Sequence, residues 1–503
     1  MKKKLLSIIS ACVLLLSWGC SDFLDVNHDP NALENIPDAK VLLPAAEMGV
    51  ANNMMGWDFG FAGAIWVEYW TQSYTASQFK TLCEYQPQNF GTAYGSLTTQ
   101  ALTDLKRIKI MSEESDNKGY YFIAEALSIF AWQIITDMWG DMPYSEALQG
   151  NEGLLHPKQD KGQDIYADLM ARIDALLQLD LSSSSVDGSY DYIYAGDLAA
   201  WRRFVNSLKL KLMIRLSETP QYNNAATLSF IESNAMITAS ARIPGSVWDD
   251  AMEGKRHPMR EFQAGGANYI SQNVIACKTF IDYLSVNNDP RLATLFSGGS
   301  RGAFLGDFDS KDDSDGNGTT DDKESYATAS FAGNIDLVIM STWEINFYVA
   351  EVYARANQPA RAKEFYDAGV QASLAQHGIS NNSILSEYAK WQDGGSVEDN
   401  IKQIAMQKWV AYCNYQHAEA FLERNRTKYP PVSDINIQAN RSNANANFPL
   451  GYLTISVNGR ARLNETLPAS PLYPQDYINR NINAPAQKTD LREKVWWNLK
   501  AGK

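Results

Sequence analysis

The sequence predicts an all-α-dominated fold built from tetratricopeptide-like helix pairs joined to a loop-rich half. Three observations support this prediction. Apolar residues recur at helical spacing in several segments, these segments come as neighbouring pairs, and long stretches rich in Pro, Gly, Ser and Asp separate the pairs. Because the helices are unevenly spaced, we expect a few pairs to act as a scaffold and the insertions to carry function.

The clearest helix pair is predicted in residues 94–138. One face of the first helix, over residues 94–111, is formed by Leu97, Ala101, Leu105 and Ile108. The second helix has the spacing of three or four residues that an α-helix requires, at Ile123, Leu127, Phe130, Ile134 and Met138. This helix is expected to end at the turn residues Gly140, Asp141 and Pro143.

Further helices are predicted along the chain. Apolar spacing marks them near residues 165–176, 201–216, 271–285, 345–356, 362–374 and 401–412. Asp197 is the expected N-cap of the 201–216 helix, because its carboxylate can accept hydrogen bonds from free backbone N–H groups. Residues 219–266 and 430–503 are expected to be irregular, since Pro, Gly or Asn are frequent there.

These elements predict one domain over residues 20–503, preceded by a signal peptide over residues 1–19. The helical scaffold would occupy two ranges, about 91–218 and 339–430. The ligand-binding half would be formed by two insertion-rich ranges, about 50–90 and 219–338, and the irregular tail would cover 430–503.

The first twenty residues are typical of a bacterial lipoprotein. Lys2, Lys3 and Lys4 precede an uncharged, mostly apolar run over residues 5–18, which is too short to span a membrane. The run ends at Gly19-Cys20, and a small residue directly before a cysteine is what a lipoprotein signal peptidase requires. We therefore expect a lipid on Cys20, and with it stable membrane anchoring. Ordinary secretion with cleavage nearby is the less favoured alternative.

Composition excludes one class of partner and limits the chemistry of the cysteines. The formal net charge is −14 and no basic cluster occurs, so nucleic acid is not an expected partner. Cys83, Cys277 and Cys413 remain after the N-terminal segment, and no C-x-x-C pair is present. We expect three buried thiols; one disulfide plus one thiol is the alternative.

The sharpest local motif is a candidate calcium loop over residues 313–324. Oxygen-bearing side chains occupy positions 1, 3, 5, 7, 9 and 12 of the loop pattern, and Gly318 occupies the turn position 6. The candidate Ca²⁺ ligands are Asp313, Asp315, Asn317, Thr319, Asp321 and Glu324. The bound ion would be structural and would order a long insertion. A solvated acidic loop is the alternative, which the sequence leaves open.

The catalytic motifs that occur in the sequence lack the local structure that their chemistry requires. Residues 298–302 match G-x-S-x-G, but neither the strand nor the helix that a nucleophile elbow needs is predicted around them. None of the five histidines has a partner at metal-binding spacing. A surface hydrolase would need two carboxylates facing each other across a cleft, and sequence spacing does not test for such a pair.

Two segments combine aromatic rings with polar side chains, as sugar binding requires: residues 57–85 and 248–269. Trp66 and Tyr69 have helical spacing and are expected to pack in the core, whereas Trp248 lies in a Pro- and Gly-rich stretch and is expected to be more exposed. The candidate ligand-binding residues are Trp70, Tyr74, Tyr85, Trp248, Arg260 and Tyr269.

Short motifs spread over the whole chain resemble one family. Cys20-Ser21-Asp22-Phe23-Leu24-Asp25 resembles its mature N-terminus, and Asp137-Met138-Trp139-Gly140-Asp141-Met142-Pro143-Tyr144 resembles the end of one of its helices. Further similar segments follow in the family's order: 201–208, Asp289-Pro290-Arg291, Gln407-Lys408-Trp409, 424–430, Leu472-Tyr473-Pro474 and Val495-Trp496-Trp497. The family is that of the starch-utilisation-system D-like (SusD/RagB) outer-membrane lipoproteins of Bacteroidetes.

This resemblance implies a non-enzymatic, surface-exposed lipoprotein that captures oligosaccharides. Members sit as a lid on a SusC-like TonB-dependent transporter barrel, and their helices support an irregular ligand-binding half. Some members resemble peptide binders, so a peptide or another non-glycan nutrient is the alternative ligand class. A structural assembly lipoprotein with protein partners is a further alternative. The family provides no residue-level motif for the ligand site.

Overall fold

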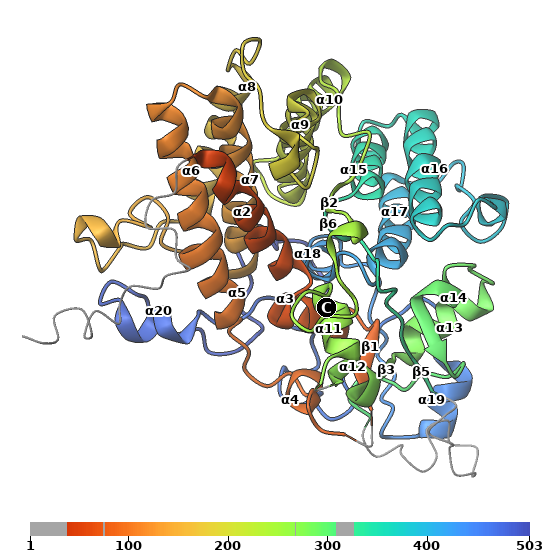
Figure 1. Cartoon of the computed structure of the whole chain (residues 1–503). Helices are drawn as coiled ribbons and strands as arrows, with labels where there is room; N and C mark the ends of the chain where they lie inside the picture. The colour runs from red at the N-terminus through yellow and green to blue at the C-terminus, as the bar shows by residue number, and fades with distance from the viewer. Residues whose placement is uncertain (1–37, 74–75, 267, 308–325) are drawn as a thin grey trace, which may run out of the picture.

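A computed structural model describes residues 38–73, 76–266, 268–307 and 326–503, and it confirms the all-α-dominated, tetratricopeptide-like fold. One side of the scaffold consists of two helix pairs that also pack on each other (Figure 1). Their helices are α6 (Thr103–Glu114), α7 (Lys118–Trp139), α8 (Gly162–Leu177) and α9 (Leu198–Arg215). The predicted N-cap is confirmed, because Asp197 accepts from the backbone N–H groups of Ala199 and Ala200.

The other side of the scaffold is formed by four helices late in the chain. They are α15 (Thr342–Arg355), α16 (Pro359–Gln376), α17 (Val397–Tyr412) and α18 (His417–Thr427). The apolar pattern predicted the first three. It did not predict α18 as a separate helix, because every residue of α18 is buried and charged residues lie among them. A helix buried on all faces has no polar stripe to reveal its period.

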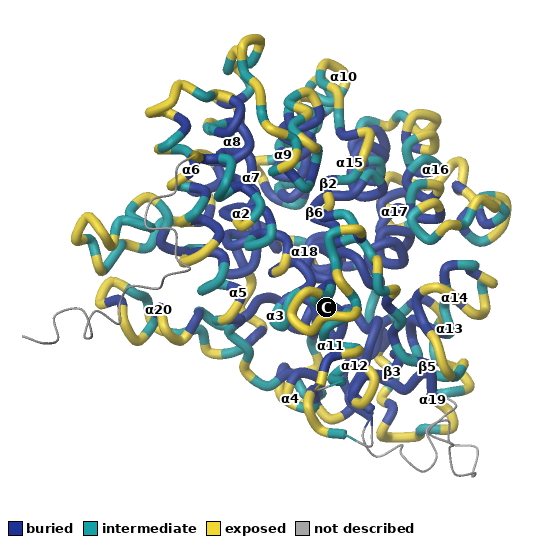
Figure 2. Tube along the Cα trace, viewed as in Figure 1, coloured by how far each residue is buried: buried dark blue, intermediate teal, exposed yellow. Residues whose placement is uncertain are grey.

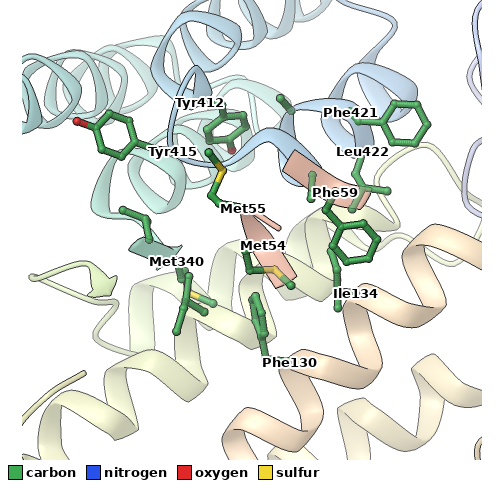
Figure 3. Packing of buried hydrophobic residues seen from close by; sticks show 14 of the residues in the cluster. Met54, Met55, Phe59, Phe130, Ile134, Met340, Tyr412, Tyr415, Phe421 and Leu422 are labelled. Atoms are coloured by element: carbon green, nitrogen blue, oxygen red, sulfur yellow. The ribbon is translucent and has the colours of Figure 1, made fainter. Parts of the chain in front are cut away.

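Two early helices connect the sides of the scaffold. They are α2 (Ala39–Met54) and α3 (Trp57–Trp66). The Cα of Gly63 in α3 lies so close to α18 that a Cβ there would be 2.4 Å from the carbonyl oxygen of His417. Figure 3 shows Met54 beside Phe130 of α7, in a buried cluster that also includes Met55, Phe59 and Phe421 of α18. Buried residues follow these central elements, and exposed residues lie around the periphery (Figure 2).

Within the described ranges, three short antiparallel pairs of strands connect the insertions to one another and to the scaffold. The strand β1 (Trp70–Gln72) pairs with β3 (Val274–Ala276), β2 (Ala241–Ile243) with β6 (Leu337–Met340), and β4 (Phe296–Gly298) with β5 (Ala327–Ala329). The pairing of β1 with β3 joins the two ranges that the sequence predicted as ligand-binding insertions.

The prediction of one continuous helix over residues 271–285 is wrong, because strand β3 interrupts it. That stretch is divided into α12 (Tyr269–Asn273), β3 and α13 (Lys278–Val286). Val274 and Ile275 are β-branched, and the backbone bonds that they form with β1 replace helical ones. Periodicity within one segment does not reveal a partner strand from a distant part of the sequence.

The stretch predicted to be irregular over residues 219–266 also contains helices, namely α10 (Asn224–Ser233) and α11 (Pro258–Ala264). The tail is mainly irregular, as predicted, with α19 (Arg441–Asn447) and α20 (Gln475–Arg480) inside it. The remaining elements are α4 (Lys80–Cys83), α5 (Gly91–Ser96), the π-helical η1 (Leu97–Leu102), α14 (Leu292–Leu295), and the short 3₁₀ turns Gly150–Glu152, Gly188–Tyr190, Gly245–Val247 and Ser383–Ser386.

Two smaller predictions are also confirmed. Cys83, Cys277 and Cys413 are buried free thiols. The side chains of Trp66 and Tyr69 lie in the core, with 1% and 0% exposure.

No helix among the described residues is both long enough and apolar enough to cross a bilayer.

A buried network of ion pairs crosses the centre of the scaffold. Arg215 of α9 donates to Asp137 of α7 at 2.9 Å and to Glu423 of α18 at 2.7 Å, and it also pairs with Glu419. Each of these side chains is at most 5% exposed. The network continues through further buried groups on four helices: Lys211, Glu344, Glu351, Lys408 and Arg426.

Neighbouring cations keep the two buried carboxylates of α18 ionised although they are dehydrated. Burial opposes the charge of Glu419, but Arg215 and Lys211 outweigh it and lower its pKa to about 2. The pKa of Glu423 likewise lies well below its usual range, because Arg426, Lys408 and Arg215 outweigh the effect of burial. Removing one member would therefore leave its partners as uncompensated buried charges.

We predict that Glu423→Ala lowers the free energy of unfolding by about 3–5 kcal/mol, because three cations lose a shared carboxylate. Chemical denaturation followed by circular dichroism measures this change. Asp174→Ala is the matched control, since it breaks the exposed pair with Lys209 on the adjoining face of α9 and should cost about 1 kcal/mol or less. Equal losses in the two variants would contradict the assigned role of the network.

The buried residue Glu68, which follows α3, should make the free energy of unfolding depend on pH. Its buried carboxyl accepts hydrogen bonds from the Thr454 backbone N–H (2.8 Å) and the Thr279 hydroxyl (2.6 Å), and burial raises its pKa to about 8. Above pH 4.5 the unfolded chain releases this proton while the folded chain retains it, so rising pH penalises folding until about pH 8. We predict that Glu68→Gln, which keeps the shape of the group, removes this decline. The test compares unfolding free energies of both proteins at pH 5 and pH 8; parallel changes would refute it.

Candidate functional site

The β1–β3 pairing creates a junction between the two predicted ligand-binding insertions. Beyond the paired strands, the Ser73 N–H donates to the Asn273 carbonyl at 2.6 Å, and the Gln72 side-chain amide donates to the same oxygen at 3.0 Å. Ser73, directly after β1, and Asn273, directly before β3, therefore lie side by side, and Figure 1 shows β1 and β3 in the lower half of the molecule. Aromatic side chains from both insertions meet at this junction.

Trp57, the first residue of α3, is the centre of what we call the aromatic cluster. Its ring centroid lies 5.1 Å from Phe61, 5.6 Å from Phe79, 5.6 Å from Phe262 and 5.1 Å from Tyr269. Phe61 and Phe79 are buried and support the cluster from below, whereas Trp57, Phe262 and Tyr269 are half-buried. Rings with one accessible part and a fixed buried part are suited to stacking against a ligand.

Polar groups border the cluster on one side. A cavity of about 200 Å³ opens beside Trp57 and Phe79, and its wall includes Asp58, Gln78 and Gln88. Burial raises the pKa of Asp58, and this carboxylate accepts a hydrogen bond from the Ala93 N–H at 2.8 Å. The cavity is smaller than the roughly 300–1,000 Å³ of pockets that enclose ligands. A ligand would therefore lie across the cluster, with its edge at these polar groups.

Helix α11 connects the cluster to a second, charged area. It carries Phe262 on the cluster side, while Arg260 donates to both carboxylate oxygens of Asp250, at 2.8 and 3.2 Å. The hydrogen bond from Arg260 lowers the pKa of Asp250. Trp248 is half-buried and edge-on to the buried His257, and its indole N–H donates to the Ile335 carbonyl at 2.9 Å.

The predicted ligand-binding residues thus have different positions. Tyr269 belongs to the aromatic cluster, and Trp248 and Arg260 lie in the charged area beyond α11. Trp70 and Tyr85 are 0% and 1% exposed, so their rings offer no face to a ligand in this structure. Trp70 packs on His417, and the Tyr85 hydroxyl accepts from the Ser456 N–H; these contacts replace the expected stacking role with core packing.

The other predicted positions lie outside the described residues: Cys20, Tyr74 and the candidate calcium ligands of residues 313–324. Among the described residues, no group of three or more His, Cys, Asp and Glu side chains is arranged to hold a metal ion. Two central residues, Trp57 and Phe262, were not among the candidates. Both lie in the aromatic-rich segments, but only their contact across the β1–β3 junction distinguishes them from core aromatics.

Comparison with known proteins identifies the family. The SusD-like family model described as "starch-binding associating with outer membrane" matches residues 30–451. Solved structures similar to this chain include a SusD homologue from Bacteroides uniformis (20% identity, TM-score 0.67, covering 91% of this chain and 99% of that chain). Another is a SusD homologue from Bacteroides fragilis (20% identity, TM-score 0.68, covering 93% of this chain and 100% of that chain).

A third similar structure is that of a chitin-binding SusD homologue from Flavobacterium johnsoniae, with 16% identity, a TM-score of 0.70, and coverage of 92% of this chain and 99% of that chain. No curated protein matches the sequence. The structural matches show the shared fold over nearly the full length of both chains. Since the family model covers most of the sequence, this chain belongs to the SusD-like family of starch-binding, outer-membrane-associated proteins.

Proposed function

We propose that this protein is a cell-surface lipoprotein that captures oligosaccharides at the aromatic cluster and delivers them to a SusC-like TonB-dependent transporter. The observation that carries the proposal is the meeting of Trp57, Phe262 and Tyr269 from two distant insertions, beside polar side chains, in a member of a starch-binding family. The protein would act by binding, without a chemical step.

The geometry suits a sugar for a physical reason. A pyranose ring has an apolar face of C–H groups and an equatorial edge of hydroxyls. The half-buried rings of the cluster would cover the face, and side chains such as Asp58, Gln78 and Gln88 would exchange hydrogen bonds with the edge. Because Phe61 and Phe79 fix Trp57 from below, little side-chain entropy would be lost on binding.

Further parts of the proposal come from other observations. The chitin-binding activity of one structurally similar homologue supports a glycan as the ligand. The family description supports a place at the outer membrane, where a lipid on Cys20 would anchor the chain. Ca²⁺ binding by residues 313–324 stays a prediction from the sequence, with the role of ordering that insertion.

We predict that Trp57→Ala weakens oligosaccharide binding at least tenfold, or about 1.4 kcal/mol, because it removes the centre of the stacking surface. Calorimetric titration measures this with starch-, chitin- and other neutral oligosaccharides and with the chain lacking residues 1–19 and carrying Cys20→Ser. Phe230→Ala is the matched control, since Phe230 is a half-buried aromatic on α10, at the other end of the molecule (Figure 1).

The control should bind like the unmodified chain. Equal affinity of the Trp57→Ala variant would exclude the aromatic cluster as the site. Binding of a peptide mixture, with no binding to any glycan, would reject the glycan ligand and leave the transporter-lid role in place.

We predict that Cys20→Ser in the full-length gene moves the protein from the membrane fraction to the soluble fraction, because no acyl chain can be attached. Fractionation of cells grown with labelled palmitate tests this: the label should be found in the unmodified protein and be absent from the variant. Label on the Cys20→Ser protein would show that anchoring depends on another residue.

A further inference from the structure

A larger cavity lies in the helical scaffold, away from the aromatic cluster. It has a volume of about 580 Å³ and lies between α6, α7 and α8, under the segment of residues 144–149. We call it the scaffold cavity. Figure 1 shows α6, α7 and α8 at the upper left, whereas α4, α11 and α12, which surround the aromatic cluster, lie at the bottom. Its volume is within the roughly 300–1,000 Å³ of ligand pockets.

Two aromatic rings form part of its wall. The Trp132 and Tyr144 rings meet edge-to-face with centroids 5.1 Å apart, and Tyr144 is half-buried. Arg172 lies 5.9 Å from the Tyr144 ring centroid and donates to its hydroxyl at 2.7 Å. Leu102, Ala147 and Leu148 add apolar surface. The cavity therefore combines an aromatic surface with a fixed polar edge.

The charged groups of the wall are arranged in donor–acceptor pairs. Lys106 contacts Glu152 at 2.9 Å, and Arg172 and Lys109 both pair with Glu125, which is 6% exposed. Lys106 and Glu152 both line the cavity, and this pair presents an N–H donor next to a carboxylate acceptor, which matches two neighbouring hydroxyls of a sugar. Each cation of the wall already pairs with a carboxylate, with Lys109 and Arg172 sharing Glu125, so an anion would have to displace one of these pairs.

Two acidic groups at the cavity also favour a ligand without negative charge. Asp164 and Asp168 of α8 line it and are exposed. Asp168 accepts from the Tyr144 hydroxyl, whereas Asp164 accepts no hydrogen bond from any described residue. These carboxylates would repel phosphates and uronic acids and can accept hydrogen bonds from sugar hydroxyls.

We propose that the scaffold cavity is a second saccharide-binding site, specific for units without acidic groups, that holds another part of the glycan captured at the aromatic cluster. This inference rests on the proposed function for its ligand class. Two separate sites on one chain would raise the avidity for a polysaccharide long enough to reach both, and would leave the affinity of each site for a short oligosaccharide unchanged.

The test is the stoichiometry of calorimetric titrations with short neutral malto-, chito-, manno- and xylo-oligosaccharides. We expect two sites in the unmodified chain and one in Trp57→Ala. Ala147→Trp, which fills the cavity, should also leave one site, and combining the two substitutions should leave none. Asp164→Ala should weaken the second site about tenfold. Asp174→Ala, another exposed acid on α8 that does not line the cavity, is the matched control. Oligogalacturonate should not bind at the cavity.

The outcomes separate the two proposals. A single site that is lost in Trp57→Ala and unaffected by Ala147→Trp and Asp164→Ala would overturn the assignment of the scaffold cavity as a binding site. It would leave the proposed function intact. One site that is lost in Ala147→Trp and retained in Trp57→Ala would support the cavity and reject the aromatic cluster. No binding of any neutral oligosaccharide would overturn both. Circular dichroism and thermal unfolding establish that Ala147→Trp is folded.

Discussion

The rest of the structure depends on the buried ion pairs between α9, α7, α15, α17 and α18. Helix α18 has no solvent-exposed face, and its carboxylates at Glu419 and Glu423 would be prohibitively costly to bury alone. They are compensated by Arg215 and Lys211 of α9 and by Lys408 of α17, together with Arg426 of α18 itself. The network therefore selects a single arrangement of the two sides of the scaffold around α18, which apolar packing alone would leave less specific.

This network explains why short motifs predicted the fold so well. Asp137, Lys408 and Arg426 belong to three of the segments that resemble the family, and all three are network members. Other such segments contact each other: Arg291 donates to Gln407 at 2.9 Å, and the Trp139 indole N–H donates to the Leu472 carbonyl at 3.0 Å. Buried polar contacts need particular residue types at particular places, so they leave a readable signature in a sequence.

The candidate site leaves no such signature. Its aromatic side chains are also the usual material of a core, and nothing in the local sequence separates the half-buried Trp57 from the buried Trp70. The difference arises from tertiary contacts. Phe61, Phe331 and His417 pack against Trp70, whereas Phe262 and Tyr269 meet Trp57 beside the β1–β3 pair. The broad location could be predicted, because both aromatic-rich segments were identified. The individual residues could not, because they depend on a contact between distant segments.

Helix α3 links the scaffold to the site. Near its C-terminal end, Gly63 lies against the His417 backbone, a closeness that only glycine permits, and this contact fixes α3 to the helix at the centre of the ion network. Trp57 is the first residue of the same helix. The position of the stacking surface is therefore determined by the rigid scaffold, while the residues around it come from insertions. A platform fixed in this way is organised before a ligand arrives, so ligand identity can depend on the insertions without any change in the helices.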